Sequence, residues 1–191
     1  MLHIANATIS QLAIIDMQVK LSSAMPAKAM QQAAQNCGIL AQAANLLGVP
    51  TIATEQYPQG LGETLPEIKT HLGKAKIIAK TVFSACGEPK FSQLLHRDKP
   101  QIILVGMEAH ICLLQTALDL SQLTISGDNK LSKQVFVVED AIISRDANNK
   151  ANAIARLREA GCVVTNTESV LFEWLGNAKH EAFKTLSTLI R

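Results

Sequence analysis

The stretch that decides the fold is KPQIILVGMEAHICLLQTALDL, residues 99–120. Residues 102–105 form a continuous apolar run rich in β-branched side chains, which is typical of a strand buried on both faces of a parallel sheet. Gly106 is expected to end that strand, and the helical spacing of apolar residues from His110 onward predicts a helix. Cys112 then lies in the first turn of that helix. Free backbone N–H groups and the positive helix end favour a thiolate there, so the sequence predicts a low pKa for this thiol.

Length and composition limit the class of protein. The chain has 191 residues, 48% of them hydrophobic, so we expect a single domain over residues 1–191 with one sizeable core. The net charge is only +2 and no basic tract occurs, which argues against a nucleic-acid partner. No secretory signal is evident and no segment has the roughly 18 apolar residues of a membrane span, so we expect no membrane association and a cytoplasmic location. The cysteines lack metal-type spacing and are expected to be free thiols: Cys37, Cys86, Cys112 and Cys162.

Short apolar runs alternate along the chain with segments of helical periodicity. The predicted strands are residues 12–15, 49–53, 77–79, 102–105, 135–138 and 162–164. The predicted helices cover residues 26–47, a short segment near 65, 91–96, the segment after 110, 147–160, the segment from 167 to 174, and 183–190. Strands that alternate with helices indicate an α/β fold with a parallel sheet and helices on both faces.

Three polar residues lie at the predicted carboxyl ends of strands. Asp16 and Lys80 directly follow such strands, and Cys112 lies just beyond another. Ligands of open parallel sheets bind outside these strand ends, so one crevice could collect all three side chains. A cation can activate a cysteine, and a carboxylate can take up and return its proton. From spacing alone the plain alternatives stay open: a packing cysteine, a turn or cap aspartate, and a solvated lysine.

Motifs over nearly the whole chain carry a family resemblance. They are IIDMQ at 14–18, TEQYPQGLGETLPE at 54–67, KTVFSA at 80–85, GMEAHICLLQTALDL at 106–120, EDAIISR at 139–145 and TNTESVLFEWLG at 165–176. Together they resemble the isochorismatase-like cysteine hydrolases, which include nicotinamidases and N-carbamoylsarcosine amidase-like enzymes. The resemblance implies a three-layer, Rossmann-like α/β fold with a six-stranded parallel sheet.

The resemblance also implies the residues of the site. Asp16, Lys80 and Cys112 would form a catalytic triad. The peptide bond between Met107 and Glu108 would be cis, and the backbone N–H groups of Glu108 and Cys112 would form an oxyanion hole. The implied function is a cysteine hydrolase that acts on a small-molecule substrate.

Departures from the family pattern refine this expectation. Metal-binding nicotinamidases carry histidines in the loop after the second strand, whereas EQYPQG at 55–60 has none, so neither a metal nor another cofactor is implied. Isochorismatases that cleave a vinyl ether generally lack the cysteine, so Cys112 indicates an amide or related carbonyl substrate. A vinyl-ether hydrolase and a non-catalytic binding protein stay open as alternatives. Segment 121–134 is longer than the usual link between this helix and the next strand.

Other polar and aromatic residues receive lesser roles. Gln18, Tyr57 and Phe83 lie on predicted loops near the triad and are candidates to line the substrate pocket. His110 is not expected to pair with Cys112, because adjacent helical side chains point about 100° apart. Two residues match family positions and are expected to form a buried ion pair or a helix cap: Arg145 and Glu168.

The resemblance also suggests a homo-oligomer, a dimer or larger. The apolar residues Phe172, Trp174 and Phe183 in the last third of the chain are expected to offer surface that a small monomer does not bury fully.

Overall fold

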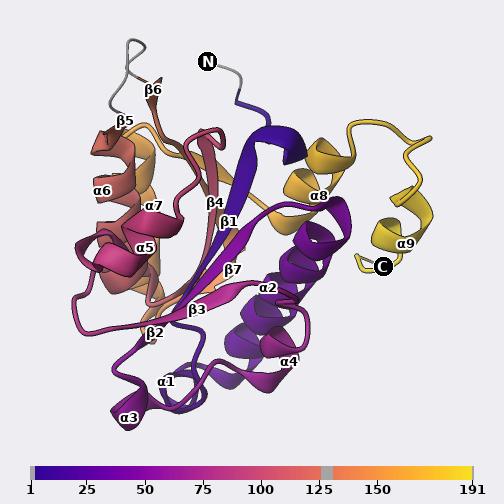
Figure 1. The fold of residues 1–191 in the computed structure, drawn as a ribbon. Helices are drawn as coiled ribbons and strands as arrows, with labels where there is room; N and C mark the ends of the chain where they lie inside the picture. The colour runs from indigo at the N-terminus through magenta and orange to yellow at the C-terminus, as the bar shows by residue number, and fades with distance from the viewer. Residues whose placement is uncertain (1–2, 126–130, 191) are drawn as a thin grey trace.

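A six-stranded sheet runs through the middle of the fold (Figure 1). The computed structural model describes residues 3–125 and 131–190. The strand order is β3-β2-β1-β4-β7-β8, and all neighbouring strands in this sheet pair in parallel. The strands are β1 (Ser10–Ile15), β2 (Thr51–Gln56), β3 (Lys76–Lys80), β4 (Gln101–Met107), β7 (Gln134–Ile143) and β8 (Val163–Thr165). The predicted α/β fold class with a six-stranded parallel sheet is confirmed.

The two central strands, β1 and β4, are buried along their whole length. Each fully buried Leu or Ile side chain contributes about 1.5–3 kcal/mol to folding, so these apolar runs fix the centre of the sheet. Gly106 lies within β4 and pairs with Ile15, and a Cβ at that position would come within 2.0 Å of the Ile15 carbonyl oxygen. The prediction that Gly106 ends the strand is therefore wrong, because the glycine serves the close approach of β1 and β4.

Helices cover both faces of the sheet and make three layers (Figure 1). One apolar cluster packs α2, α8 and α9 against one face, and a second packs α5, α6 and α7 against the other. The α-helices are α1 (Val19–Ser22), α2 (Ala27–Leu47), α3 (Pro58–Leu61), α4 (Pro66–Lys69), α5 (Pro89–Leu94), α6 (Leu114–Gln122), α7 (Ala147–Glu159), α8 (Thr167–Leu175) and α9 (Phe183–Ser187). Shorter turns are η1 (Ala7–Ile9) and η2 (Ala85–Gly87).

β2 and β7 extend furthest beyond their predicted ends. β2 continues through Glu55 and Gln56, which the sequence analysis assigned to a loop. The Glu55 carboxylate accepts the backbone N–H and the hydroxyl of Thr64 at 2.7 and 2.8 Å, and Gln56 pairs with the end of β3. β7 runs past Asp140 to Ile143, with a register shift against β4. Contacts distant in sequence thus keep polar strand ends in the sheet.

The long segment 121–134 contains a small antiparallel pair of strands. β5 (Thr124–Ile125) pairs with β6 (Leu131–Ser132), and residues 126–130 between them lie outside the described residues.

The aromatic residues near the carboxyl end are less exposed than predicted. Trp174 is buried and its indole N–H donates to the Ser10 hydroxyl at 3.2 Å. The rings of Phe172 and Phe183 pack together with centroids 6.0 Å apart, which leaves Phe172 39% exposed. The expectation that Trp174 supplies an association surface is therefore wrong.

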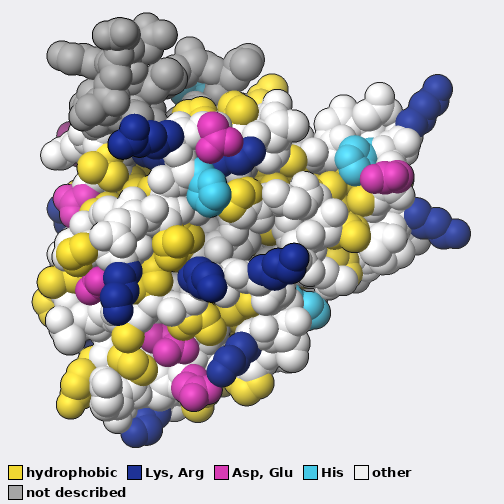
Figure 2. Space-filling model, in the orientation of Figure 1, with side chains coloured by type: hydrophobic (Ala, Val, Ile, Leu, Met, Phe, Trp, Pro, Cys, Tyr) yellow, Lys and Arg dark blue, Asp and Glu magenta, His cyan; other side chains and the backbone are white. Residues whose placement is uncertain are grey.

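The surface is mixed in character. On the face shown in Figure 2, Lys and Arg side chains are scattered among apolar and acidic ones. None of the helices in the described part of the chain is long and apolar enough to cross a membrane.

Candidate active site

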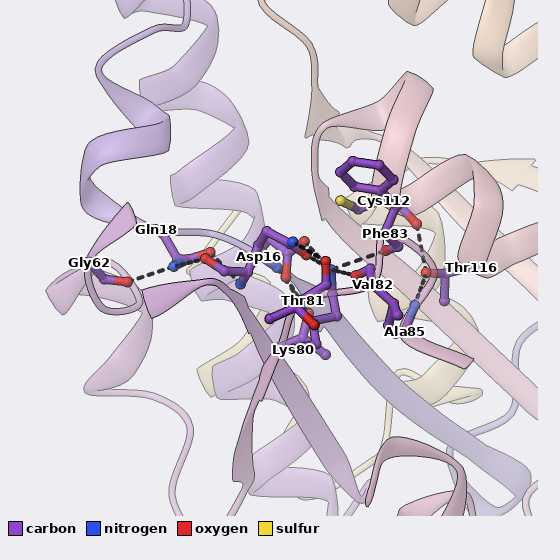
Figure 3. Close-up of polar contacts among 12 residues, drawn as sticks. Asp16, Gln18, Gly62, Lys80, Thr81, Val82, Phe83, Ala85, Cys112 and Thr116 are labelled. Atoms are coloured by element: carbon purple, nitrogen blue, oxygen red, sulfur yellow. Dashed lines mark hydrogen bonds and ion pairs between the residues drawn. The ribbon is translucent and has the colours of Figure 1, made fainter. Parts of the chain in front are cut away.

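Asp16, Lys80 and Cys112 come together at the carboxyl edge of the sheet (Figure 3). Asp16 follows β1, Lys80 is the last residue of β3, and Cys112 lies in the turn after β4. Lys80 Nζ lies 2.7 Å from Asp16 Oδ2, and neither side chain is exposed to solvent. Both charged groups act on the Cys112 thiol. The structure therefore brings into one cluster the three residues that the strand-end argument selected.

The Cys112 thiol is buried, with 6% of the residue exposed. Burial, and after it the negative charge of Asp16, raises the pKa of this thiol to about 12, and the ammonium group of Lys80 offsets only part of the rise. The prediction of a low pKa is wrong, because it weighed the helix end and the cation without the loss of solvent. At neutral pH the sulfur carries its proton, so nucleophilic attack needs an acceptor, and a carboxylate lies beside it.

Four acceptors surround the ammonium group of Lys80. Gln56 Oε1 at 2.6 Å and Asp16 Oδ2 at 2.7 Å make the short contacts. The carbonyl oxygens of Phe83 and Val82 lie at 3.1 and 3.2 Å. A lysine ammonium has three N–H donors, so the two carbonyl groups share one of them when the short contacts take the others. The cation thus also holds the backbone of the loop that follows β3.

The Asp16 carboxylate is fixed through both oxygens. Thr54 Oγ1 donates to Oδ1 at 2.7 Å, and Lys80 donates to Oδ2. The backbone N–H of Asp16 donates to the Thr54 carbonyl at 3.1 Å. Asp16 has a φ of 51°, in the left-handed region that aspartate tolerates better than most residues with a side chain. The turn that ends β1 therefore holds the carboxylate in a single orientation.

The turn that carries Cys112 is not a regular helix start. The peptide bond between Met107 and Glu108 is cis, the geometry that the family resemblance implied. Residues Ala109–Leu113 (η3) form a π-helical turn, and α6 begins only at Leu114. The prediction of a regular helical first turn around Cys112 is therefore wrong. Sequence periodicity does not reveal a π-turn, because its wider spacing lasts for a single turn.

Thr116 links this turn to the loop after β3. Its hydroxyl donates to the Cys112 carbonyl at 2.6 Å and accepts the backbone N–H of Ala85 at 2.9 Å. The residue is fully buried. Thr116 was not among the predicted site residues, although threonine often bonds to the carbonyl group four residues earlier in a helix.

Glu108 connects the same turn to the end of β7. Its Oε2 accepts the backbone N–H of Arg145 at 3.1 Å and lies 3.6 Å from Arg145 Nε. His110 Nδ1 lies 2.9 Å from the Ser144 hydroxyl and 4.0 Å from Glu108 Oε2. His110 is thus engaged at the end of β7. Arg145 forms an ion pair as expected, but the pair is not buried, because 60% of the Arg145 side chain is exposed. Glu168 is exposed in the first turn of α8.

The three pocket candidates differ in their placement. Gln18 is fully buried, and its amide bonds to the backbone of Gln56 at 2.8 and 3.1 Å and to the Gly62 carbonyl at 2.6 Å. This favours a role in holding the loop over a role in lining the pocket. Tyr57 and Phe83 are 54% and 56% exposed, and in Figure 3 the Phe83 ring lies at the Cys112 end of the cluster. Their contact with substrate stays a prediction.

Two further residues of the cluster were missed by the sequence analysis. Thr54 contacts Asp16, and Gln56 contacts Lys80. The two residues are two positions apart in β2, so both side chains point to the same face of the strand. The prediction ended this strand at residue 53, which hid this shared face.

A sizeable hollow in the protein surface lies away from the cluster of Asp16, Lys80 and Cys112. A hollow of about 340 Å³ lies at the amino ends of the strands, at the opposite edge of the sheet, and its lining includes Gln11, Lys76 and His96. Within residues 3–125 and 131–190, no group of three or more His, Cys, Asp and Glu side chains is arranged to hold a metal ion.

Known proteins share this fold and much of this sequence. Residues 10–169 match the model of the isochorismatase domain. Isochorismatase domain-containing protein 2 of Bos taurus is 37% identical over 185 residues, which cover 95% of this chain and 83% of the relative. The Homo sapiens protein of the same name is 40% identical over 78% of this chain and 67% of the relative. A solved structure titled MAR1 ribonuclease from Caenorhabditis elegans superposes with a TM-score of 0.87 and 36% identity over 97% of this chain and 91% of that chain. The chain therefore belongs to the isochorismatase family, whose members include hydrolases.

Proposed function

We propose that this protein is a cysteine hydrolase that attacks a small amide or related carbonyl compound with Cys112. The observation that carries the proposal is the buried cluster in which Asp16 and Lys80 pair at 2.7 Å and both act on the Cys112 thiol. A nucleophile, a proton acceptor and an orienting cation are the groups that covalent catalysis at a carbonyl carbon requires.

The first half of the reaction forms an acyl-enzyme. The Cys112 proton passes to the Asp16 carboxylate while Sγ bonds to the substrate carbonyl carbon and an electron pair moves to the carbonyl oxygen. The backbone N–H groups of Glu108 and Cys112 stabilise this oxyanion. When it collapses, the carbon–nitrogen bond breaks and Asp16 returns the proton to the leaving nitrogen. Lys80 stays protonated throughout and keeps the thiolate and the carboxylate in register.

Water completes the second half. Asp16 removes a proton from water as its oxygen attacks the thioester carbon. The carbon–sulfur bond then breaks, the acid product forms and the proton returns to the Cys112 sulfur. The raised pKa of this thiol fits the cycle, because the resting nucleophile and the released one are both protonated.

A substrate panel tests the proposal. We would incubate the wild-type protein and the Cys112→Ala variant with ureido acids, nicotinamide and short aliphatic and aromatic amides, and measure released ammonia or amine. Turnover of any member that disappears in the variant supports the proposal. Binding without turnover across the panel would instead support a non-catalytic binding protein, and equal turnover by the Cys112→Ala variant would contradict the covalent mechanism.

The panel should include a short single-stranded RNA. The similar structure from Caenorhabditis elegans is titled a ribonuclease. The net charge of +2 and the scattered cations on the face shown in Figure 2 favour a small substrate over a polyanion. Cysteine-dependent cleavage of RNA would reverse that choice.

Compartment and assembly form the rest of the proposal. All four cysteines are free thiols, which suits the reducing cytoplasm. We also propose a homo-oligomer, in which exposed apolar side chains such as Tyr57, Val82 and Phe83 could be covered. Light scattering at micromolar concentration that finds only a 20.6 kDa species would refute the oligomer.

A further inference from the structure

β2 carries none of the three proposed catalytic residues, yet it contacts both members of the charged pair. Thr54 donates to Asp16 and Gln56 accepts from Lys80, at 2.7 and 2.6 Å. We propose that Gln56, held in turn by Gln18, is a positioning residue that orients the Lys80 ammonium and thereby controls how readily Cys112 loses its proton. The inference rests on the proposed role of Cys112 as nucleophile.

The orientation of the Gln56 amide is determined by its two neighbours. Nε2 donates to the Thr81 carbonyl at 2.7 Å, and Oε1 faces Lys80 Nζ. An amide has one donor end and one acceptor end. A flipped amide would place its N–H groups against the ammonium and its oxygen against a carbonyl oxygen, so both contacts would become repulsive. The site therefore presents a neutral acceptor to Lys80 in one orientation.

Gln18 fixes the backbone from which this amide extends. Its Oε1 accepts the Gln56 N–H at 2.8 Å and its Nε2 donates to the Gln56 carbonyl at 3.1 Å and the Gly62 carbonyl at 2.6 Å. Gln18 is fully buried, so these bonds are made away from solvent competition. The Gln56 side chain thus contacts Lys80, and the Gln18 side chain holds the Gln56 backbone. These contacts give Gln18 a function other than contact with substrate.

Loss of the Gln56 acceptor changes where the ammonium group lies. The carbonyl oxygens of Val82 and Phe83, now at 3.2 and 3.1 Å, would each take one N–H group. These longer contacts would replace the short one, so the position of the ammonium beside Asp16 and Cys112 would be less closely fixed and its lowering effect on the pKa of Cys112 would weaken. A carboxylate at position 56 would keep the contact but compete with Asp16 for the same cation and add a negative charge near the thiol.

The test compares Gln56→Met, Gln56→Glu and Gln18→Met with a matched control, Gln11→Met. Gln11 is also a buried glutamine, and its amide bonds to the Leu94 carbonyl at 2.9 Å and to the His96 N–H at 3.0 Å at the other edge of the sheet. The readout is the rate at which iodoacetamide alkylates Cys112 between pH 7 and 10, measured by peptide mass mapping. Thermal unfolding of each variant identifies any loss of folding.

We expect a fixed order of rates at pH 8. A change of one pKa unit alters the thiolate fraction tenfold, so Gln56→Met should slow alkylation about 3- to 10-fold and Gln56→Glu more than about tenfold. The alkylation rate of Gln18→Met should lie between those of the wild type and Gln56→Met, and the rate of Gln11→Met should stay within about twofold of the wild-type rate. Wild-type rates in both folded Gln56 variants, or an equal loss in Gln11→Met, would overturn the inference. Because alkylation requires no substrate, the inference can hold even if the panel shows no turnover.

Discussion

Replacement of Lys80 by methionine should strongly destabilise the fold. The substitution keeps most of the side-chain volume and removes the cation, so the Asp16 carboxylate remains buried without its ion partner. Removal of one member of a buried pair costs about 3–5 kcal/mol. For a chain of this length each kcal/mol lowers the Tm by about 2–4 °C, so the expected loss is about 6–20 °C.

Thermal unfolding followed by circular dichroism measures this loss, and two further variants test its cause. Asp16→Asn combined with Lys80→Met removes both charges, so the double variant should be more stable than Lys80→Met alone. Lys69→Met breaks the Lys69–Glu63 pair, which has a similar distance of 2.8 Å but lies at the surface with 47% and 74% of the side chains exposed. Its Tm should stay within about 2 °C of the wild type. Equal Tm losses in Lys69→Met and Lys80→Met, or a double variant less stable than Lys80→Met, would refute the reasoning.

Three further predictions concern the nucleophile and its turn. With a substrate found by the panel, Cys112→Ala and Asp16→Asn should each lower kcat by about a thousandfold or more, and the double variant should lose little more than either; losses that multiply would contradict a common catalytic unit. The alkylation rate of Cys112 should keep rising with pH above 9, because thiolate accumulates until the pH reaches the pKa of about 12; a plateau near pH 7 would contradict the burial argument. Thr116→Val should lower the free energy of unfolding, measured in urea, by about 1–3 kcal/mol, because the Ala85 N–H loses its buried acceptor. An unchanged urea midpoint would show that the Thr116 hydrogen bonds are dispensable for stability.

The sequence predicted the centres of the strands better than their ends. Continuous apolar runs marked β1 and β4, because a strand buried on both faces needs such residues at successive positions. Glu55 and Gln56 looked like the start of a loop, yet both belong to β2. Their partners, Thr64 and Lys80, lie 9 and 24 residues away, so local patterns do not report these contacts.

The sequence likewise predicted the main residues of the candidate site but not their pKa shifts and supporting contacts. The strand-end rule and the family resemblance were enough to select Asp16, Lys80 and Cys112. The direction of the pKa shift of Cys112 was not predictable, because it depends on how completely the folded chain removes solvent from the sulfur. The contacts of Gln56 and Thr116 were also hidden, since each depends on the side-chain placement of a different segment.

Lys80 belongs to an edge strand, whereas Asp16 follows a strand at the centre of the sheet. The ion pair therefore spans β2 and ties the border of the sheet to its middle. Edge elements open at lower free energy than the core in native-state hydrogen exchange. Each local opening of β3 would withdraw the ammonium while the carboxylate and the sulfur stay in place. The free energy of this local opening then sets the fraction of molecules with a complete site, and the hydrogen-exchange protection of the β3 amides reports it. That fraction can fall well before the protein unfolds as a whole.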